Sequence, residues 1–499
     1  MMRCFGSMKR VVVTIMVMAA VSSIAHGVDR PYTGAPTRDG DLQSNLRLLN
    51  LWGEQPESVQ EIYEAAYNVL TADPAARFAD VAADETFQDR CESHDIVMLG
   101  GPMLGCVSAD GARVWVRTSR PASVEVLIVE GDVTHSFGPD HASAENDLTA
   151  IVQVSGLRPA TRYPYRVLVD GVAAPLPENA TIVTAPPEVA AGKMRIAFGS
   201  CYHRWGLGNM TLTKAIQERQ PTAMLLLGDV AVQDRNEHLG LHRADYLMRD
   251  MMPAWQRLVA KTPVYVTWDD HDYFDNDLAG IPDGFTAEDR NGVRQVWREN
   301  WNNPMYGLEE AGGVFLRDRI GPADIIMVDN RYFREAGTFL GDAQMRWLKE
   351  QLLDCEGPFI IMSCGTMWSD YVSDGKDSWG VYDPEGREAL FSFIEKHQIG
   401  GVLLISGDRH GARGFTIPRP DDFAFYEFGA ASLGGRRGPS VTKPEWETQL
   451  YGVEDVYAFG EFEIDATLED PEVTFRLIQA EGNVLYEITL SRSVLTPGF

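Results

Sequence analysis

The stretch "VTWDDHDYFDND", residues 266–277, crowds five aspartates around one histidine directly after an apolar, strand-like run. Neighbouring carboxylates repel one another and resist removal from water, so such a cluster normally lies on a solvated surface. A bound cation would compensate the negative charge and permit burial. The position of the cluster at the end of a predicted strand makes it the starting point for both the fold and the site.

Five further apolar runs resemble the one that precedes this stretch. Each is nearly continuous in Val, Ile, Leu and Met, as expected for strands that are covered on both faces. The runs are "MRIAFGSC" (194–201), "AMLLLGD" (223–229), "DIIMVDN" (324–330), "FIIMSCG" (359–365) and "GVLLISGDRH" (401–410). Helical stretches separate them, namely "DYLMRDMMPAWQRLVAK" (245–261), "DAQMRWLKEQLLD" (342–354) and "REALFSFIEKH" (387–397). This alternation predicts a layered α/β architecture over residues 190–499, with C-terminal hairpins added to a sheet.

The chain before residue 190 divides into three predicted parts. Residues 1–27 have a basic start, an apolar core and a small-residue cleavage site, which is typical of a signal peptide. Residues 28–95 contain the helical pattern "SVQEIYEAAYNVL". Residues 96–187 alternate apolar and polar positions, as in "ARVWVRT" and "SVEVLIVE", which predicts a fibronectin-type or Ig-like β-sandwich. We expect the protein to be secreted or periplasmic.

Composition excludes several classes of protein. The formal net charge is −28 and the longest basic cluster is Arg436-Arg437, so specific nucleic-acid recognition is not expected. After the signal, we expect no transmembrane segment, because no apolar stretch approaches the required length. Five cysteines follow the signal, and an odd number leaves at least one thiol unpaired in an exported chain. Neither the disulfide pairing nor the oligomeric state follows from the sequence.

Each predicted strand ends in a group that is capable of chemistry. A single Asp after a strand is ordinary turn chemistry, and a single Cys there is usually a small buried hydrophobic residue. Ligands of open α/β sheets, however, bind beyond the carboxyl ends of the strands, so the groups are expected to converge on one edge. The repeated placement favours a metal site. The groups are Cys201, Asp229, Asp270 with His271, Asp329, Cys364, and Asp408 with His410.

The motifs "GSC", "GD", "WDDHD", "VDNRYFR" and "SGDRH", in this order, resemble the PhoD-like alkaline phosphatases of the calcineurin-like metallophosphoesterase superfamily. The resemblance also covers the predicted β-sandwich domain and "GTMWSDYVSDGKDSWG" (365–380). It implies a four-layer α/β fold, a double β-sandwich flanked by helices, with two metals between the sheets. It also implies hydrolysis of phosphate mono- or diesters, or of lipid phosphate esters, outside the cytoplasm.

The resemblance also implies two unlike metal sites. Cys201, His203, Asp229 and His410 would hold one ion with soft and borderline donors, which suit iron or zinc. Asp229, Asp270 and Asp408 would hold the other with oxygen alone, which suits calcium, magnesium or manganese. In this assignment Asp229 bridges both ions.

Two departures from the family pattern affect these assignments. Iron-tyrosinate members carry tyrosine three residues after the bridging aspartate, where this chain has Val232. His203 would then fill the vacant position as a ligand, or else only line the cleft. The histidine that a middle strand usually supplies to the oxygen-rich site is also missing, because "IIMSCGT" offers only Ser363, Cys364 and Thr366.

The expected reaction is attack on phosphorus by a hydroxide that bridges the two metals. His271 would stabilise charge or protonate the leaving oxygen. Arg331 and Arg409 are candidate phosphate clamps, because a guanidinium matches phosphate bidentately. Arg331 has an equal alternative, which is to brace Asp329.

Two other classes of function stay open at this point. One is a non-catalytic binding protein in which a decayed metal site only stabilises the fold. The other is a serine hydrolase built on Ser432 of "AASLG", with His410 and Asp408 nearby in sequence. The order of these three residues is wrong for an α/β-hydrolase.

Overall fold

The computed structural model describes residues 40–178, 180–188, 192–370, 378–438 and 446–498. The predicted signal peptide and residues 28–39 lie outside this described part. Among the helices that it contains, none is both long and apolar enough to span a bilayer.

Helices form the N-terminal segment, where the apolar periodicity predicted them. They are α1 (Leu42–Leu49), α2 (Glu57–Ala72), α3 (Phe78–Ala83) and α4 (Glu85–Ser93). Asp41 and Asp84 cap α1 and α4, each accepting from a backbone N–H of the first turn. The apolar face of α2 packs on α7 (Leu239–Met251) of the α/β region, so the segment is attached to the body of the molecule.

A β-sandwich follows, as the alternating pattern predicted. One sheet has the order β1-β2-β5, with β1 (Met98–Gly105), β2 (Ala112–Thr118) and β5 (Thr149–Val154). The other has the order β4-β3-β6-β7, with β3 (Ala122–Glu130), β4 (Val133–Ala142), β6 (Arg162–Val169) and β7 (Val172–Ala173), while β8 (Thr181–Val183) pairs with β6. Val124, Val126 and Ile128 of β3 point into a core that the sandwich residues form together with Ala260, which follows α8.

The first sheet of the α/β region joins strands from both of its ends, in the order β11-β10-β9-β19-β20-β21. The parallel strands are β9 (Lys193–Gly199), β10 (Ala223–Leu227) and β11 (Val264–Thr267). The antiparallel strands are β19 (Ala458–Asp465), β20 (Glu472–Gln479) and β21 (Val484–Ser491), with β19 paired to β9. The predicted C-terminal hairpins therefore complete this sheet.

The second sheet has the order β12-β13-β14-β15-β17-β16-β18. Its strands are β12 (Leu316–Ile320), β13 (Ala323–Met327), β14 (Phe359–Cys364), β15 (Val402–Ser406), β16 (Ala412–Pro418), β17 (Ala424–Gly429) and β18 (Gln449–Val453). Strands β13, β14, β15 and β17 run parallel. The sequence analysis identified three of these strands and missed β12 and β16 to β18.

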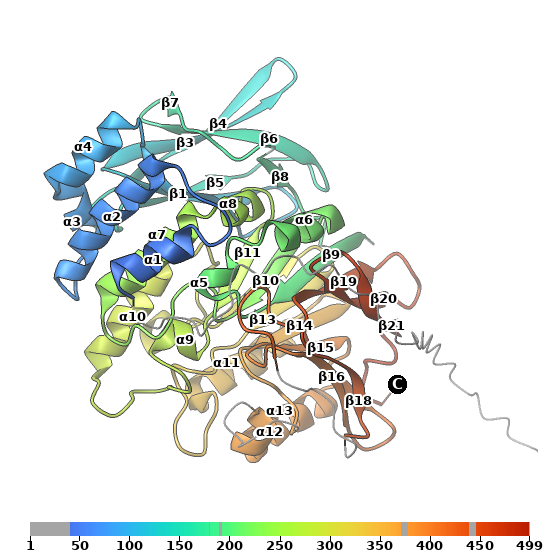
Figure 1. Cartoon of the computed structure of the whole chain (residues 1–499). Coiled ribbons are helices and arrows are strands. Elements are labelled where there is room, and N and C mark those ends of the chain that lie inside the picture. Colours follow the sequence, from blue (N-terminus) through green and yellow to red (C-terminus); the bar gives the residue numbers. More distant parts are fainter. Residues whose placement is uncertain (1–39, 179, 189–191, 371–377, 439–445, 499) are drawn as a thin grey trace, which may run out of the picture.

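The two sheets pack face to face and have helices outside them (Figure 1). Successive residues of β13 separate the two sides: Ile325 belongs to the core between the sheets, and Ile326 to the core beneath α11 and α13. The fold is thus mixed α/β with several sheets, as predicted. The remaining helices are α5 (His203–Gly206), α6 (Met210–Arg219), α8 (Pro253–Val259), α9 (Asp270–Tyr273), α10 (Ala287–Asn300), η1 (Glu309–Ala311), α11 (Gly341–Leu353), α12 (Trp379–Tyr382) and α13 (Pro384–Lys396).

The helical stretch predicted over residues 245–261 is two helices. Helix α7 ends at Met251, and Pro253 opens α8 at its first helical position. Proline has no backbone N–H to donate and fits the first turn of a helix, so it begins a new helix here.

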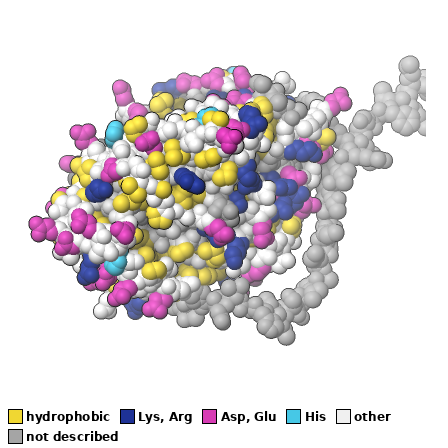
Figure 2. All heavy atoms as spheres, turned by 90° about the horizontal axis from the view of Figure 1, so that it is seen from above, with side chains coloured by type: hydrophobic (Ala, Val, Ile, Leu, Met, Phe, Trp, Pro, Cys, Tyr) yellow, Lys and Arg dark blue, Asp and Glu magenta, His cyan; other side chains and the backbone are white. Residues whose placement is uncertain are grey.

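Acidic side chains are spread over the face that Figure 2 displays, with lysines and arginines among them. Other acidic residues, such as Asp229 and Asp270, are buried and do not contribute to this surface.

A buried ion-pair cluster connects the sandwich to the rest of the molecule. Asp147, which precedes β5, accepts from Nε of Arg243 on α7 at 2.9 Å and lies 3.7 Å from Nη2 of Arg117. Its other oxygen accepts from the backbone N–H of Phe78 at 2.8 Å. Arg243 also pairs with Glu299 of α10 at 2.8 Å. Asp147 therefore contacts the N-terminal segment, the sandwich and the α/β region at once.

We expect Asp147→Asn to lower the free energy of unfolding by about 3–5 kcal/mol, because it leaves two buried guanidinium groups short of one anion. Burial opposes ionisation of Asp147, but Arg243 and Arg117 outweigh it and lower the pKa below the usual 3.8. The difference from wild type should therefore be complete above pH 4 and shrink as the pH falls through the folded-state pKa.

Chemical denaturation at several pH values measures this difference. Glu130→Gln is the control, because Glu130 and Arg158 form an exposed pair whose loss should change stability by less than about 1 kcal/mol. Equal effects of the two substitutions would contradict the role of Asp147.

Candidate metal centre

The predicted site residues come from the carboxyl ends of strands in both sheets. Cys201 follows β9, Asp229 follows β10, and Asp270 with His271 opens α9 after β11. Asp408 and His410 follow β15 of the second sheet. The sequence analysis expected the groups to converge on one edge, and the family resemblance implied a site between two sheets. Two sheets contribute, because their parallel strands end on the same side of the shared core.

The backbone of these loops is unusual. Cys201, His203, Asp229, Asp408 and His410 all have φ between +48° and +63°. Residues with a Cβ rarely adopt this left-handed conformation, and its strain is typical of functional sites. The loops are therefore shaped to present these side chains, at some cost in local stability.

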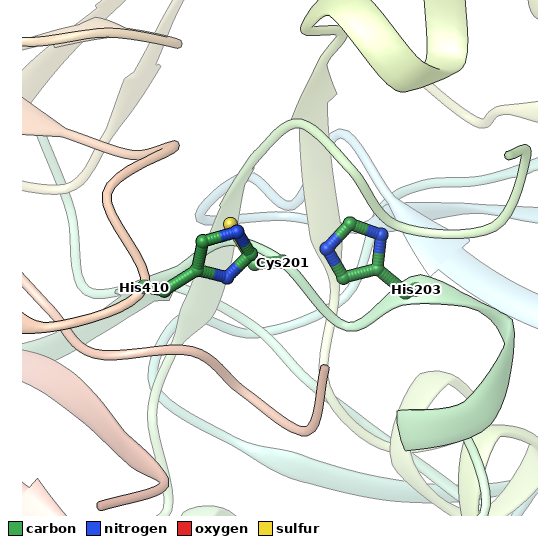
Figure 3. Close-up of side chains that lie close together, drawn as sticks. All are labelled: Cys201, His203 and His410. Carbon is green, nitrogen blue, oxygen red and sulfur yellow. The ribbon is translucent and has the colours of Figure 1, made fainter. Parts of the chain in front are cut away.

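The first cluster consists of Cys201, His203 and His410, and its ligand atoms lie within 4.8 Å of one another. Figure 3 shows the imidazoles of His203 and His410 side by side, with the Cys201 sulfur next to His410. The two rings are 5.6 Å apart between centroids. Asp229 lies next to the cluster, with Oδ2 3.7 Å from the Cys201 sulfur and 4.0 Å from Nε2 of His203.

Two oxygen-rich clusters lie beside the first one. Asp229, Asp270 and His271 form one, and Asp269, Asp270 and Asp408 form the other, each with ligand atoms within 4.8 Å. Asp270 belongs to both, as expected of a residue that faces a shared cavity. Asp269 was not among the predicted ligands, although "WDDHD" contains it.

Ligand atoms in these clusters are buried and, within the described part of the chain, have no hydrogen-bond partner. They are Nε2 of His203, Oδ1 of Asp229, Oδ2 of Asp269 and Nδ1 of His410. A buried polar atom without a partner costs about 1–3 kcal/mol, more if charged. A cation bound among them would satisfy these atoms, so the residues fit a metal.

Burial dominates the ionisation of Cys201, Asp229 and His203. It raises the pKa of the Cys201 thiol well above its usual range, and Asp229 and Asp408 add to the shift. Burial likewise raises the pKa of Asp229. It lowers the pKa of His203 well below its usual range, helped by His271. A cation placed here would favour the thiolate and the carboxylates, because its charge opposes the effect of burial.

Arg331 braces Asp269 rather than Asp329. Its Nε donates to Asp269 Oδ1, and Nη2 lies 3.8 Å from Asp270. Asp329 accepts the backbone N–H of Arg331 and not its guanidinium; its other donors are the indole N–H of Trp268 and the backbone N–H groups of Tyr332 and Val314. The alternative in which the guanidinium supports Asp329 is therefore wrong. Nη1 and Nη2 are buried and have no hydrogen-bond partner among the described residues. Arg409 is placed between Asp408 and His410, and its side chain is 23% exposed.

Three side chains that the sequence analysis did not assign hold the site residues. Nδ1 of His203 is 2.7 Å from Oε1 of Gln233, whose amide nitrogen donates to Asp234 at 3.0 Å. Asp234 in turn accepts from Nδ1 of His271 at 2.5 Å. Asp272 accepts the backbone N–H groups of Asp229 and Val230 at 2.5 and 3.2 Å. A polar residue pair after "GDVAV" was the available signal for Gln233 and Asp234.

The end of the middle strand has no room for a side chain at Gly365, because the side chains of Asn330 and Asp269 lie too close. A Cβ at Gly365, which follows β14, would lie 2.6 Å from Asn330 Oδ1 and 2.8 Å from Asp269 Oδ1. Cys364, which the sequence analysis expected to converge on the site, is buried and contacts Thr366 at 3.8 Å. All five cysteines of the described chain are free thiols.

Comparison with solved structures defines the class of the fold. It matches the structure of PhoD with a TM-score of 0.65 at 18% identity, covering 79% of this chain and 90% of that one. It also matches a purple acid phosphatase from yellow lupin (Lupinus luteus) seeds with a TM-score of 0.56 at 12% identity, covering 78% and 74%. The fold is thus of the kind found in these phosphatases.

Sequence comparison identifies the family. A family model described as PhoD-like phosphatase matches residues 196–489, and the chain belongs to this family. A second model, a domain of unknown function (DUF7800), matches residues 96–187. Alkaline phosphatase D of Bacillus subtilis (strain 168) is 23% identical over 322 residues, which are 52% of this chain. The match spans about half, 53%, of the length of that curated relative.

We expect Cys201→Ser to weaken metal binding by at least about tenfold, because serine replaces the soft sulfur donor with a poor ligand. Elemental analysis of the purified protein would reveal the loss. Cys364→Ser is a matched control, because the same change is made to another buried cysteine, at the end of a strand of the second sheet. Equal metal content in the two variants would refute Cys201 as a ligand.

Proposed function

We propose that this protein is a phosphoesterase that hydrolyses phosphate mono- or diesters with two bound metal ions. The observation that carries the proposal is the convergence of Cys201, His203, Asp229, Asp270, Asp408 and His410 from two sheets. Buried ligand atoms of His203, Asp229 and His410 in this set have no hydrogen-bond partner among the described residues. Membership of the PhoD-like phosphatase family supports the reaction class. The similarity to alkaline phosphatase D of Bacillus subtilis supports the same class.

The donor types divide the site between two ions. Cys201, His203 and His410, with Asp229 beside them, would hold an ion such as iron or zinc. Asp229, Asp270 and Asp408 would hold an ion such as calcium, magnesium or manganese. Asp269 is the candidate for the ligand that the sequence left unassigned, since one of its oxygens lacks a partner in the described chain.

Two bound metals supply an activated water nucleophile and neutralise the phosphate oxygens. The chain supplies the rest of the chemistry. Because Asp234 occupies Nδ1 of His271, the other ring nitrogen is the one able to donate a proton to the leaving oxygen. Nη1 and Nη2 of Arg331, together with the partly exposed Arg409, would bind the phosphate oxygens.

Export also belongs to the proposal. The basic start, apolar core and cleavage site of residues 1–27 support secretion or a periplasmic location. Mass spectrometry of the N-terminus of the mature protein, made in a host that exports it, would test cleavage after residue 27.

The two alternative functions have less support. Ser432 is fully buried, and its hydroxyl donates to the backbone oxygen of Cys201 at 2.8 Å, so it is engaged rather than available as a nucleophile. A decayed binding protein has no need of His271 beside Asp270, yet Asp234 and Gln233 hold this histidine in place.

Metal content and hydrolysis test the function together. We expect the purified protein to contain two metal ions per chain and to hydrolyse an aryl phosphate monoester or diester. A chelator should abolish the activity and added metal should restore it. Activity that survives complete removal of metal would refute the metal mechanism. Full metal content with neither ester hydrolysed, nor a phospholipid, would favour the binding protein.

Asp229→Asn tests the shared carboxylate. We expect turnover to fall by more than about a hundredfold. Asp229 is within reach of both groups of ligands, so its loss should reduce activity more than the loss of a residue that only supports a ligand. Asp283→Asn, in the exposed loop after the site, is the control and should retain activity. A near-wild-type rate in Asp229→Asn would rule out the two-metal arrangement.

A further inference from the structure

The N-terminal helical segment, residues 40–95, lies outside both ranges that the family models match. It nevertheless packs against α5, the short helix that begins with His203 (Figure 1). This contact raises the question of what the segment contributes to the site.

Helix α5 needs outside support. It has only four residues, and His203, its first residue, has a φ of +48°. A single helical turn is unstable by itself, and a left-handed first residue adds strain. Contacts from other parts of the chain must therefore fix the position of the His203 imidazole.

Trp52 provides one such contact. Its indole N–H donates to the backbone oxygen of Trp205 at 2.6 Å. The ring of Trp205 in turn stacks on His203, with centroids 4.7 Å apart and planes 4° from parallel. A Cβ on Gly208 would lie only 2.5 Å from Trp52, so the Trp52 ring also lies directly against the chain after α5.

Arg204 provides the second contact. Its Nη1 donates to Oδ1 of Asn45 on α1 at 2.5 Å, and the Asn45 amide donates to the hydroxyl of Tyr63 on α2 at 2.9 Å. Arg204 also pairs with Asp245 of α7 at 3.3 Å. Arg204, Asn45 and Tyr63 are all fully buried. Two neighbouring residues of α5 are thus tied to the N-terminal segment.

The backbone at Gly435 also restricts the movement of the His203 ring. A Cβ on Gly435 would lie 2.2 Å from Cδ2 of His203, so the chain passes close to the ring there. Gln233 holds Nδ1, which leaves Nε2 facing the ligand set of Cys201 and His410. The imidazole is therefore confined between Trp205 and Gly435, and Trp52 limits how far Trp205 can withdraw.

We propose that the N-terminal helical segment is part of the metal centre, and that Trp52 is a positioning residue that holds His203 in ligand geometry through Trp205. The inference rests on the proposed function, because it requires a metal at the cluster of Cys201, His203 and His410. The proposal gives the segment before the two matched ranges a defined role in the site.

Cobalt binding to the full-length mature protein tests the proposal. Co²⁺ suits a site of sulfur and nitrogen donors, its thiolate charge-transfer band reports Cys201, and its visible bands report coordination geometry. We expect Trp52→Ala to raise the dissociation constant for Co²⁺ by about 10–100-fold, the range seen when support of a ligand is lost, and to alter the visible bands. Trp52→Phe keeps an aromatic ring but loses the N–H donor, so it should bind Co²⁺ more tightly than Trp52→Ala and less tightly than the wild type.

Val81→Ala is the matched control. Val81 is buried on α3 in the same segment, so its truncation loosens the segment without removing a hydrogen bond to α5. It should retain the wild-type dissociation constant and spectrum, with circular dichroism confirming that all variants are folded. Wild-type cobalt binding by both Trp52 variants would overturn this inference alone. A wild-type protein that binds no cobalt would overturn the proposed function as well. A Val81→Ala variant that loses as much affinity as Trp52→Ala would reduce the role of Trp52 to general stability.

Discussion

The structure depends on bringing several carboxylates out of water and close together where the strands of two sheets end. Asp229, Asp269, Asp270 and Asp272 are all at most 3% exposed. Such a set is unstable unless positive charge enters among it. Arg331 supplies part of that charge from within the chain, by pairing with Asp269. His271 supplies further positive charge, because Asp229 and Asp270 overcome the effect of burial and raise its pKa well above the usual value. The ligand atoms of His203, Asp229, Asp269 and His410 that lack a hydrogen-bond partner in the described part of the chain are where a cation would complete the balance.

The fold was largely readable from the sequence because its central strands are covered on both faces. Such strands are almost continuously apolar, and their ends are marked by Asp, Cys and His, as at Cys201 and Asp408. Strands β16 to β18 were missed because their signal is weaker: β18 is only half-buried along most of its length, and β16 and β17 carry polar residues such as Arg413 and Glu427 within the strand. The break between α7 and α8 was missed because the apolar periodicity continues across Pro253.

The ligands that directly follow the strands were predictable from the sequence, and the residues that support these ligands were not. The six predicted metal ligands and His271 belong to the clusters, whereas Asp329 and Cys364, which were also expected to converge, do not. Gln233, Asp234 and Asp269 were not assigned because their roles depend on which loops face one another, and residue type alone does not reveal this. Arg331 illustrates the same limit: sequence proximity suggested Asp329 as its partner, but the chain turns so that the guanidinium meets Asp269 from another strand.

The ion pairs around Asp147 have a consequence for how this architecture evolves. A sandwich joined to its neighbour through apolar surface can be exchanged for another of similar shape. Here, removal of the sandwich would leave the buried Arg243 with Glu299 as its remaining partner in this cluster, and a new sandwich would need a carboxylate at the place of Asp147. The sandwich and the α/β region are therefore expected to be inherited together, as a unit that recombination rarely separates.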